Sequence, residues 1–143
     1  MSFEAAEAAR RAANAVRVGR IVSVDADSAQ AVVDFGGLIS PPLDVAQLRA
    51  GGLQFWWMPT EGEQVVVLCE SGDIAQGIIT FGIYAGNAPS SDGGVPMINL
   101  GGGKMIVQGD IEVTGDVIAS GVSLVKHTHS DVVSGNSSTG KPN

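Results

Sequence analysis

A six-residue repeat in the C-terminal third limits the structures that this chain can adopt. The segment divides into the blocks GKMIVQ, GDIEVT, GDVIAS and GVSLVK, which begin at Gly103, Gly109, Gly115 and Gly121. Short repeats of fixed period are typical of β-helical and stacked architectures. Because six is a multiple of two, the alternation of a β-strand keeps its phase from one block to the next. We therefore interpret the segment as a strip of β-structure.

The strip has one apolar face and one mostly polar face. The large side chains of the odd-numbered face are Met105, Val107, Ile111, Val113 and Val117. About 25 residues of amphipathic strand form at most a marginal hairpin in water, and the chain offers no second sheet to cover this face. We expect copies of the chain to cover one another, in a homo-oligomer wound around a common axis.

The only two histidines, His127 and His129, follow this repeat. Both have odd numbers, so continued alternation would direct both imidazoles inward, where they are costly unless they have partners. Two chains would supply four imidazoles and three chains six, an octahedral set suited to iron, cobalt or nickel, whereas zinc favours four ligands and calcium or magnesium favours oxygen. We predict His127 and His129 as metal ligands.

Residues 16–84 have the pattern of a small β-barrel. Strands are predicted over residues 16–25, 30–36, 62–70 and 74–84. Phe55–Trp57 is predicted as a further strand, and Leu43–Leu48 is compatible with a strand or a helical turn. Neighbouring side chains of a strand face opposite ways, so we expect Trp56 or Trp57 to enter the core. About five short strands favour an OB-fold, with an SH3-like barrel as the alternative.

Composition excludes several classes of protein. The net charge is −7 and no basic cluster exists beyond Arg10 and Arg11, which disfavours nucleic acid as a partner. Cys69 lies in an apolar run and is expected to be buried and inert. No secretion signal or membrane-spanning run is evident, so we expect a soluble protein made in a cytoplasm. No catalytic constellation can be built with two histidines, and a closed six-imidazole site has no position for substrate, so we do not expect an enzyme.

In this order, the barrel, the glycine-punctuated strip and the terminal HTH resemble the baseplate assembly protein V family. These proteins are the central spikes of contractile phage tails and phage-tail-like bacteriocins. The stretch WWMPTEGEQVVVLCESGDIAQGIITFGIY (residues 56–84) resembles their OB-fold, which is shared with spike proteins of the type VI secretion system. The pair His127 and His129 resembles the family's tip motif.

The resemblance implies a mainly β homotrimer with an OB-fold collar, an intertwined triple-stranded β-helix and a pointed tip. One iron ion per trimer would be held there by His127 and His129 of each chain. The implied partners are tail tube, hub and baseplate proteins, and the outer membrane that the spike pierces on sheath contraction. The implied location is the baseplate tip of a virion or phage-tail-like particle. The expected divisions are a helical docking segment (1–16), the OB-fold (17–86), a linker (87–96), the β-helix (97–126) and the tip (127–143).

Two alternatives remain open from the residues. The N-terminal helix, capped by Ser2, is either a loosely packed terminus or a docking segment for a partner. The barrel could instead be a binding module for an oligonucleotide or polysaccharide, with Trp56 and Trp57 as a stacking platform and the C-terminal segment as an oligomerising stem.

Overall fold

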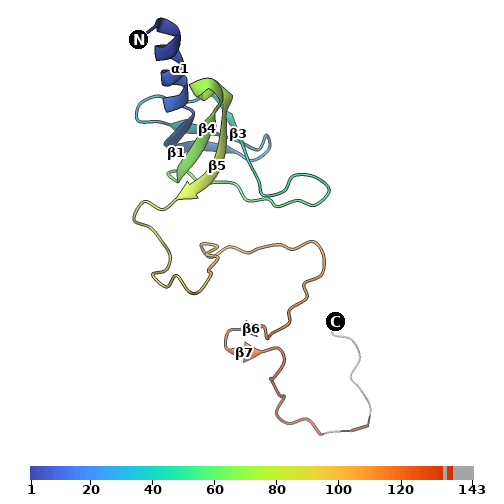
Figure 1. Ribbon diagram of the computed structural model, residues 1–143. Coiled ribbons are helices and arrows are strands. Elements are labelled where there is room, and N and C mark those ends of the chain that lie inside the picture. The colour runs from blue at the N-terminus through green and yellow to red at the C-terminus, as the bar shows by residue number, and fades with distance from the viewer. Residues whose placement is uncertain (134, 137–143) are drawn as a thin grey trace. The chain divides into compact units, whose positions relative to one another are not determined.

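The computed structural model describes residues 1–133 and 135–136. The chain divides into two compact units, one comprising Met1–Met97 and one beginning at Ile98, just after the expected linker. The first unit contains a helix and a barrel, and the second contains a short hairpin (Figure 1). Within the described residues, no helix combines the length and the apolar character needed to cross a membrane.

The first unit begins with helix α1, Phe3–Ala13, as the sequence predicts. The Ser2 hydroxyl caps it by accepting a hydrogen bond from the Ala5 N–H at 3.1 Å. Glu7 forms ion pairs with Arg10 and Arg11, one turn further along. No residue of α1 is buried, so most of its surface is exposed.

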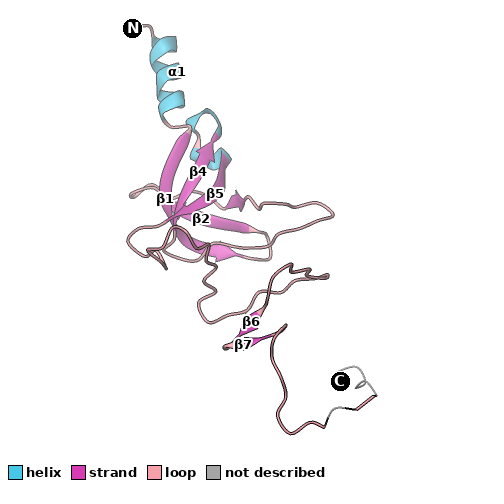
Figure 2. Ribbon diagram, turned by 60° about the horizontal axis from the view of Figure 1, so that its bottom comes forward, coloured by secondary structure: helices cyan, strands magenta, loops and turns pink. Residues whose placement is uncertain are grey.

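Five strands form a closed barrel in the order β1-β2-β3-β5-β4, with β4 pairing back to β1 (Figure 2). The strands are β1 (Val16–Asp25), β2 (Gln30–Asp34), β3 (Leu43–Val45), β4 (Gln64–Cys69) and β5 (Gly77–Ile83). Only the β3–β5 pair is parallel. Two 3₁₀ turns, η1 (Glu70–Gly72) and η2 (Ile74–Gln76), connect β4 to β5. This closed five-stranded order is that of the predicted OB-fold.

The barrel interior is filled by small and branched side chains. The buried core consists of Ile21, Ala31, Val33, Leu43, Val65, Val67, Cys69 and Ile79. Val24 also packs against this core although it is three residues from Ile21. A β-bulge between Ile21 and Ser23 explains this, because the extra residue shifts the alternation by one position. Burial raises the pKa of the Cys69 thiol, consistent with the inert, buried cysteine that we expected.

The strand predicted at Phe55–Trp57 is wrong. These residues lie in a loop in which the Gln47 side chain replaces a strand partner: its Oε1 accepts from the Trp57 N–H at 2.9 Å and its Nε2 donates to the Trp57 carbonyl at 3.3 Å. Trp56 and Trp57 are 60% and 47% exposed, so neither enters the core. The prediction failed because it assumed the two-sided geometry of a strand, and the fifth strand is instead β3 in the Leu43–Leu48 segment.

The second unit has little regular structure in a single chain. Among its described residues, the strands are β6 (Ile118–Ala119) and β7 (Val122–Ser123), which form one hairpin. The large odd-numbered side chains of the repeat are all exposed, Ile111 by 67% and Val113 by 48%. One chain therefore leaves the apolar face of the strip uncovered. The triple-stranded β-helix stays a prediction.

The β6–β7 hairpin corrects one step of the sequence argument. Ala119 pairs directly with Val122, and Ser120 and Gly121 form the turn with φ values of +51° and +84°. Directly paired residues point to the same face of a hairpin. Odd-numbered residues before the turn are therefore on the same face as even-numbered residues after it. The alternation inferred from the repeat therefore does not continue through Gly121 to the histidines. The physical reason is the Ser-Gly turn, which reverses the chain instead of extending it.

Candidate functional site

His127 and His129 nevertheless lie side by side. Their ring centroids are 5.1 Å apart and the rings are nearly perpendicular. The Nδ1 atom of His127 is 2.8 Å from the Ser123 carbonyl oxygen and 3.1 Å from that of Leu124. A carbonyl oxygen can only accept, so Nδ1 is the donor, and in the neutral ring the Nε2 lone pair is left free. This is the state in which an imidazole binds a metal.

The hairpin before the histidines is held together by Asp116. Its carboxylate accepts hydrogen bonds from the Ser123 hydroxyl and from the Val125 N–H, the latter at 3.1 Å. The hydrogen bond from the Ser123 hydroxyl, and after it the bond from the Val125 N–H, hold the pKa of Asp116 below its ordinary value. The hydroxyl oxygen of Ser123 also accepts a hydrogen bond from the Lys126 N–H at 2.8 Å. The backbone N–H of His127 donates to the Ser123 carbonyl oxygen at 3.2 Å. A continuous set of hydrogen bonds thus runs from Asp116 to His127.

A single chain does not complete a metal centre. Within residues 1–133 and 135–136 of one chain, no group of three or more histidine, cysteine or acidic side chains is placed to hold an ion. The two adjacent imidazoles, one with a free Nε2, fit a site that shares its ligands between copies. Their chemistry suits a transition metal better than calcium or magnesium.

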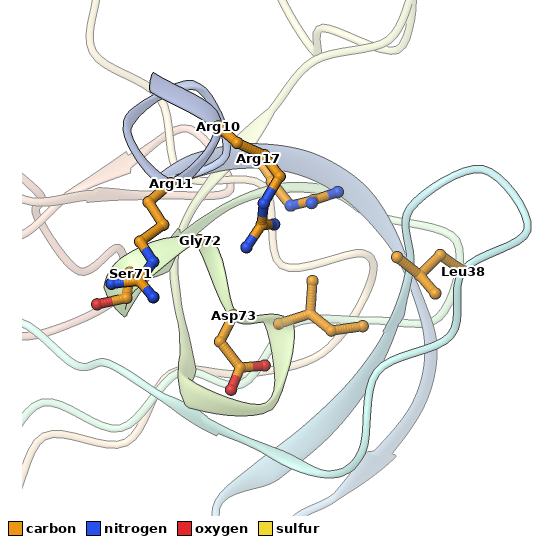
Figure 3. Close-up of a pocket in the computed structure, with 8 residues that line it drawn as sticks. Arg10, Arg11, Arg17, Leu38, Ser71, Gly72 and Asp73 are labelled. Atoms are coloured by element: carbon orange, nitrogen blue, oxygen red, sulfur yellow. The ribbon is translucent and has the colours of Figure 1, made fainter. Parts of the chain in front are cut away.

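A second candidate site lies in the first unit, where α1, β1 and the β4–β5 connection surround a cavity of about 550 Å³ (Figure 3). Arg10, Arg11 and Arg17 line it together with Asp73 and Leu38. The Arg17 guanidinium carbon lies 5.8 Å from the centre of the Phe35 ring. Leu38 and Ile74 add apolar side chains to the cationic groups of the lining.

The Arg17 side chain contains a buried donor without an internal partner. Among the described residues, no hydrogen-bond acceptor reaches its Nε atom. A buried donor left unpaired costs about 1–3 kcal/mol. The charged groups of the cavity are thus Arg17, the Asp73 carboxylate, and Arg10 and Arg11, which are both paired with Glu7.

Comparisons with known proteins match both units of the chain. Residues 17–84 match the family described as the type VI secretion system/phage-baseplate injector OB domain. Residues 121–143 match the GpV apex motif, and this match includes both histidines. Both units of the chain therefore match the phage baseplate spike family.

A curated relative supports this assignment. The spike protein of Escherichia phage P2 is 37% identical to this chain over 84 residues, which are 59% of the chain and 40% of the phage protein. The comparison thus spans well under half of that relative's length. The family resemblance drawn from the sequence is confirmed, and so is the OB barrel. The family is structural and is not a family of enzymes.

Three residues of these sites were not predicted from the sequence. Asp116 and Ser123 were treated only as members of a repeat, although the Ser120-Gly121 dipeptide is itself a turn signal. Arg17 was treated as one polar position of a strand, because nothing in the local pattern shows that α1 and the β4–β5 connection lie beside it. The histidines were identified from the sequence, but the hydrogen bonds from Asp116 and Ser123 that precede them were not.

Proposed function

We propose that this protein is the homotrimeric central spike of a contractile tail baseplate, with a structural metal at its tip. The observation that carries the proposal is the order of parts in one chain: an OB barrel, an exposed apolar strip and a histidine pair within the apex match. Three chains would cover the apolar faces of one another's strips, and burial of such surface gains about 25 cal/mol per Å².

The metal would be held by His127 and His129 of each chain, six imidazoles in all. Iron is the ion that we propose, and other six-coordinate transition metals are compatible with the same ligands. A closed set of six ligands leaves no open position, so the ion would join the three chains at the tip without catalysing a reaction. Because the metal binds only the assembled state, it would stabilise that state by mass action.

The spike would act mechanically, as part of the baseplate of a virion or phage-tail-like particle. On contraction of the sheath, the tip would be driven through the outer membrane of a target bacterium. The exposed helix α1 and the arginine-lined pocket beside it would dock to tail tube or hub proteins. A metal that links all three chains would oppose fraying, which begins at chain ends.

The test combines sedimentation mass with elemental analysis of the purified full chain. We expect a trimer with about one metal ion per three chains. His127→Ala and His129→Ala should each lose the metal. Thr128→Ala, which alters only the residue between them, should retain it. A metal-free monomer of the wild-type chain would overturn the proposal.

The exposure of Trp56 and Trp57 favours one second candidate, an OB-fold module that binds an oligonucleotide or polysaccharide. Phe55 and Trp57 also stack, with ring centroids 6.1 Å apart. The net charge of −7 argues against nucleic acid. Titration with single-stranded DNA and soluble polysaccharides, monitored by tryptophan fluorescence, separates the candidates, because only the binding module predicts saturable quenching.

A further inference from the structure

The hydrogen bonds that precede the histidines connect residues on either side of the β6–β7 turn. Asp116 precedes the β6–β7 hairpin, and Ser123 lies in its second strand, seven residues later. The hairpin turn brings them together, and the Leu124 N–H donates to the Val117 carbonyl at 2.9 Å beside them. The result is a compact loop whose end is the peptide that carries His127.

Ser123 contacts His127 through one atom and Asp116 through another. Its hydroxyl donates to Asp116 and accepts from the Lys126 N–H, and its carbonyl oxygen lies 2.8 Å from His127 Nδ1. The hydroxyl therefore fixes the turn in which the carbonyl faces the ring. An Nδ1–H donor on a carbonyl determines both the tautomer and the orientation of the imidazole.

We propose that Asp116 and Ser123 are positioning residues, which hold His127 as the Nδ1–H tautomer with Nε2 directed to the metal. This inference rests on the proposed function, since it assigns a purpose to the atoms behind one ligand of the proposed metal. Neither residue would contact the ion. Their effect would pass through the Ser123 carbonyl and the turn that presents it.

The first test reads the tautomer directly and needs no metal. The full-length protein, labelled with ¹⁵N-histidine and treated with EDTA, is studied by long-range ¹H–¹⁵N correlation NMR at a pH where the rings are neutral. His127 of the wild-type protein should be the Nδ1–H tautomer. Ser123→Ala and Asp116→Ala should each shift it towards the mixed state of a free imidazole. Ser123→Thr, which keeps the hydroxyl, should retain the wild-type spectrum.

The second test measures how firmly the metal is held. Loss of a supporting group behind a histidine ligand typically costs 10–100-fold in metal affinity. We expect the metal to be released to excess EDTA about tenfold faster from Ser123→Ala and Asp116→Ala than from wild type, at equal sedimentation mass. Ser123→Thr should release it at close to the wild-type rate. So should Thr128→Ala, which changes the residue between the two histidines in the sequence and none of the hydrogen bonds described above.

The two proposals fail in different ways. A wild-type protein without metal would refute the metal centre, while the NMR measurement would still decide whether Asp116 and Ser123 fix the ring. A wild-type trimer that holds metal, with unchanged tautomer and release rate in both alanine variants, would refute the positioning role and leave the proposed function intact. If only one alanine variant changes both readouts, the role belongs to that residue and the joint assignment is overturned.

Discussion

A Cβ atom added to Gly72 would lie 3.0 Å from the Cβ atom of Asn14, which caps the end of α1. The Arg11 carbonyl oxygen would be almost as close, at 3.1 Å. The backbone of Gly72 also has φ +74°, in the region that favours glycine. This close approach holds the β4–β5 connection against the helix and so forms one wall of the arginine-lined pocket.

Gly72→Ala should therefore destabilise the first unit for two reasons, which are backbone strain at residue 72 and displacement of α1. We expect a loss of about 2 kcal/mol in the apparent free energy of unfolding, measured by denaturant titration at one protein concentration. Gly62→Ala is the matched control, because Gly62 has φ +81° but nothing within 4 Å of its added Cβ. It should lose only about 1 kcal/mol. Equal losses in the two variants would show that the contact with α1 is unimportant.

The helix α1 should weaken in acid because of Glu7. Its ion pairs with Arg10 and then Arg11 lower the pKa of Glu7 from 4.5 to about 2. A carboxyl group whose pKa falls on folding stabilises the folded state above its ordinary pKa, and this contribution is lost as the pH drops towards the lowered value. The helical Cα chemical shifts of α1 should therefore decline between about pH 4.5 and pH 2.

Glu7→Gln provides the control for this acid transition, because it removes the titrating group and leaves Glu4 in place. The variant should have less helix at neutral pH and a flatter pH profile over the same range. Superimposable profiles for the two proteins would contradict the assignment of the transition to Glu7.

The apolar face of the strip should control assembly. Val113 lies on the odd-numbered face before the hairpin turn and is 48% exposed in the single chain. Val113→Asp would bury an unpaired carboxylate between copies and should convert the oligomer to a monomer, as measured by sedimentation. Thr114→Asp adds the same charge one residue later, on the polar face, and should keep the oligomeric mass. If both variants assemble, the odd-numbered face is not the buried one.

Much of the barrel follows from local pattern. Alternating β-branched residues define β1, β2, β4 and β5 to within a few residues, because one side of each strand must fill the interior. The assignment failed at Phe55–Trp57, where aromatic composition indicated a strand but the Gln47 side chain supplies the partner. A contact between residues ten positions apart leaves no periodic trace in the sequence.

The residues around the histidines show the same difference between what local pattern predicts and what long-range contacts determine. The repeat predicted an uninterrupted alternation that would carry His127 inward, and the Ser120-Gly121 turn breaks that alternation. The two histidines were identified because their residue type and spacing are visible in the sequence. Their orientation was not, because it depends on Asp116 reaching Ser123 across the hairpin.

The order of residues is enough to identify the chemistry that this chain carries: a barrel-forming β pattern, an apolar strip too thin to cover itself, and two imidazoles at its end. These properties depend on residue type and short-range spacing, which the sequence shows directly. The groups that meet in space became known only from the fold, and they include Gly72 with α1, the arginines around one pocket, and Asp116 with Ser123 before His127. Such contacts depend on chain reversal and close packing, and a single turn or bulge changes the face to which every later residue belongs.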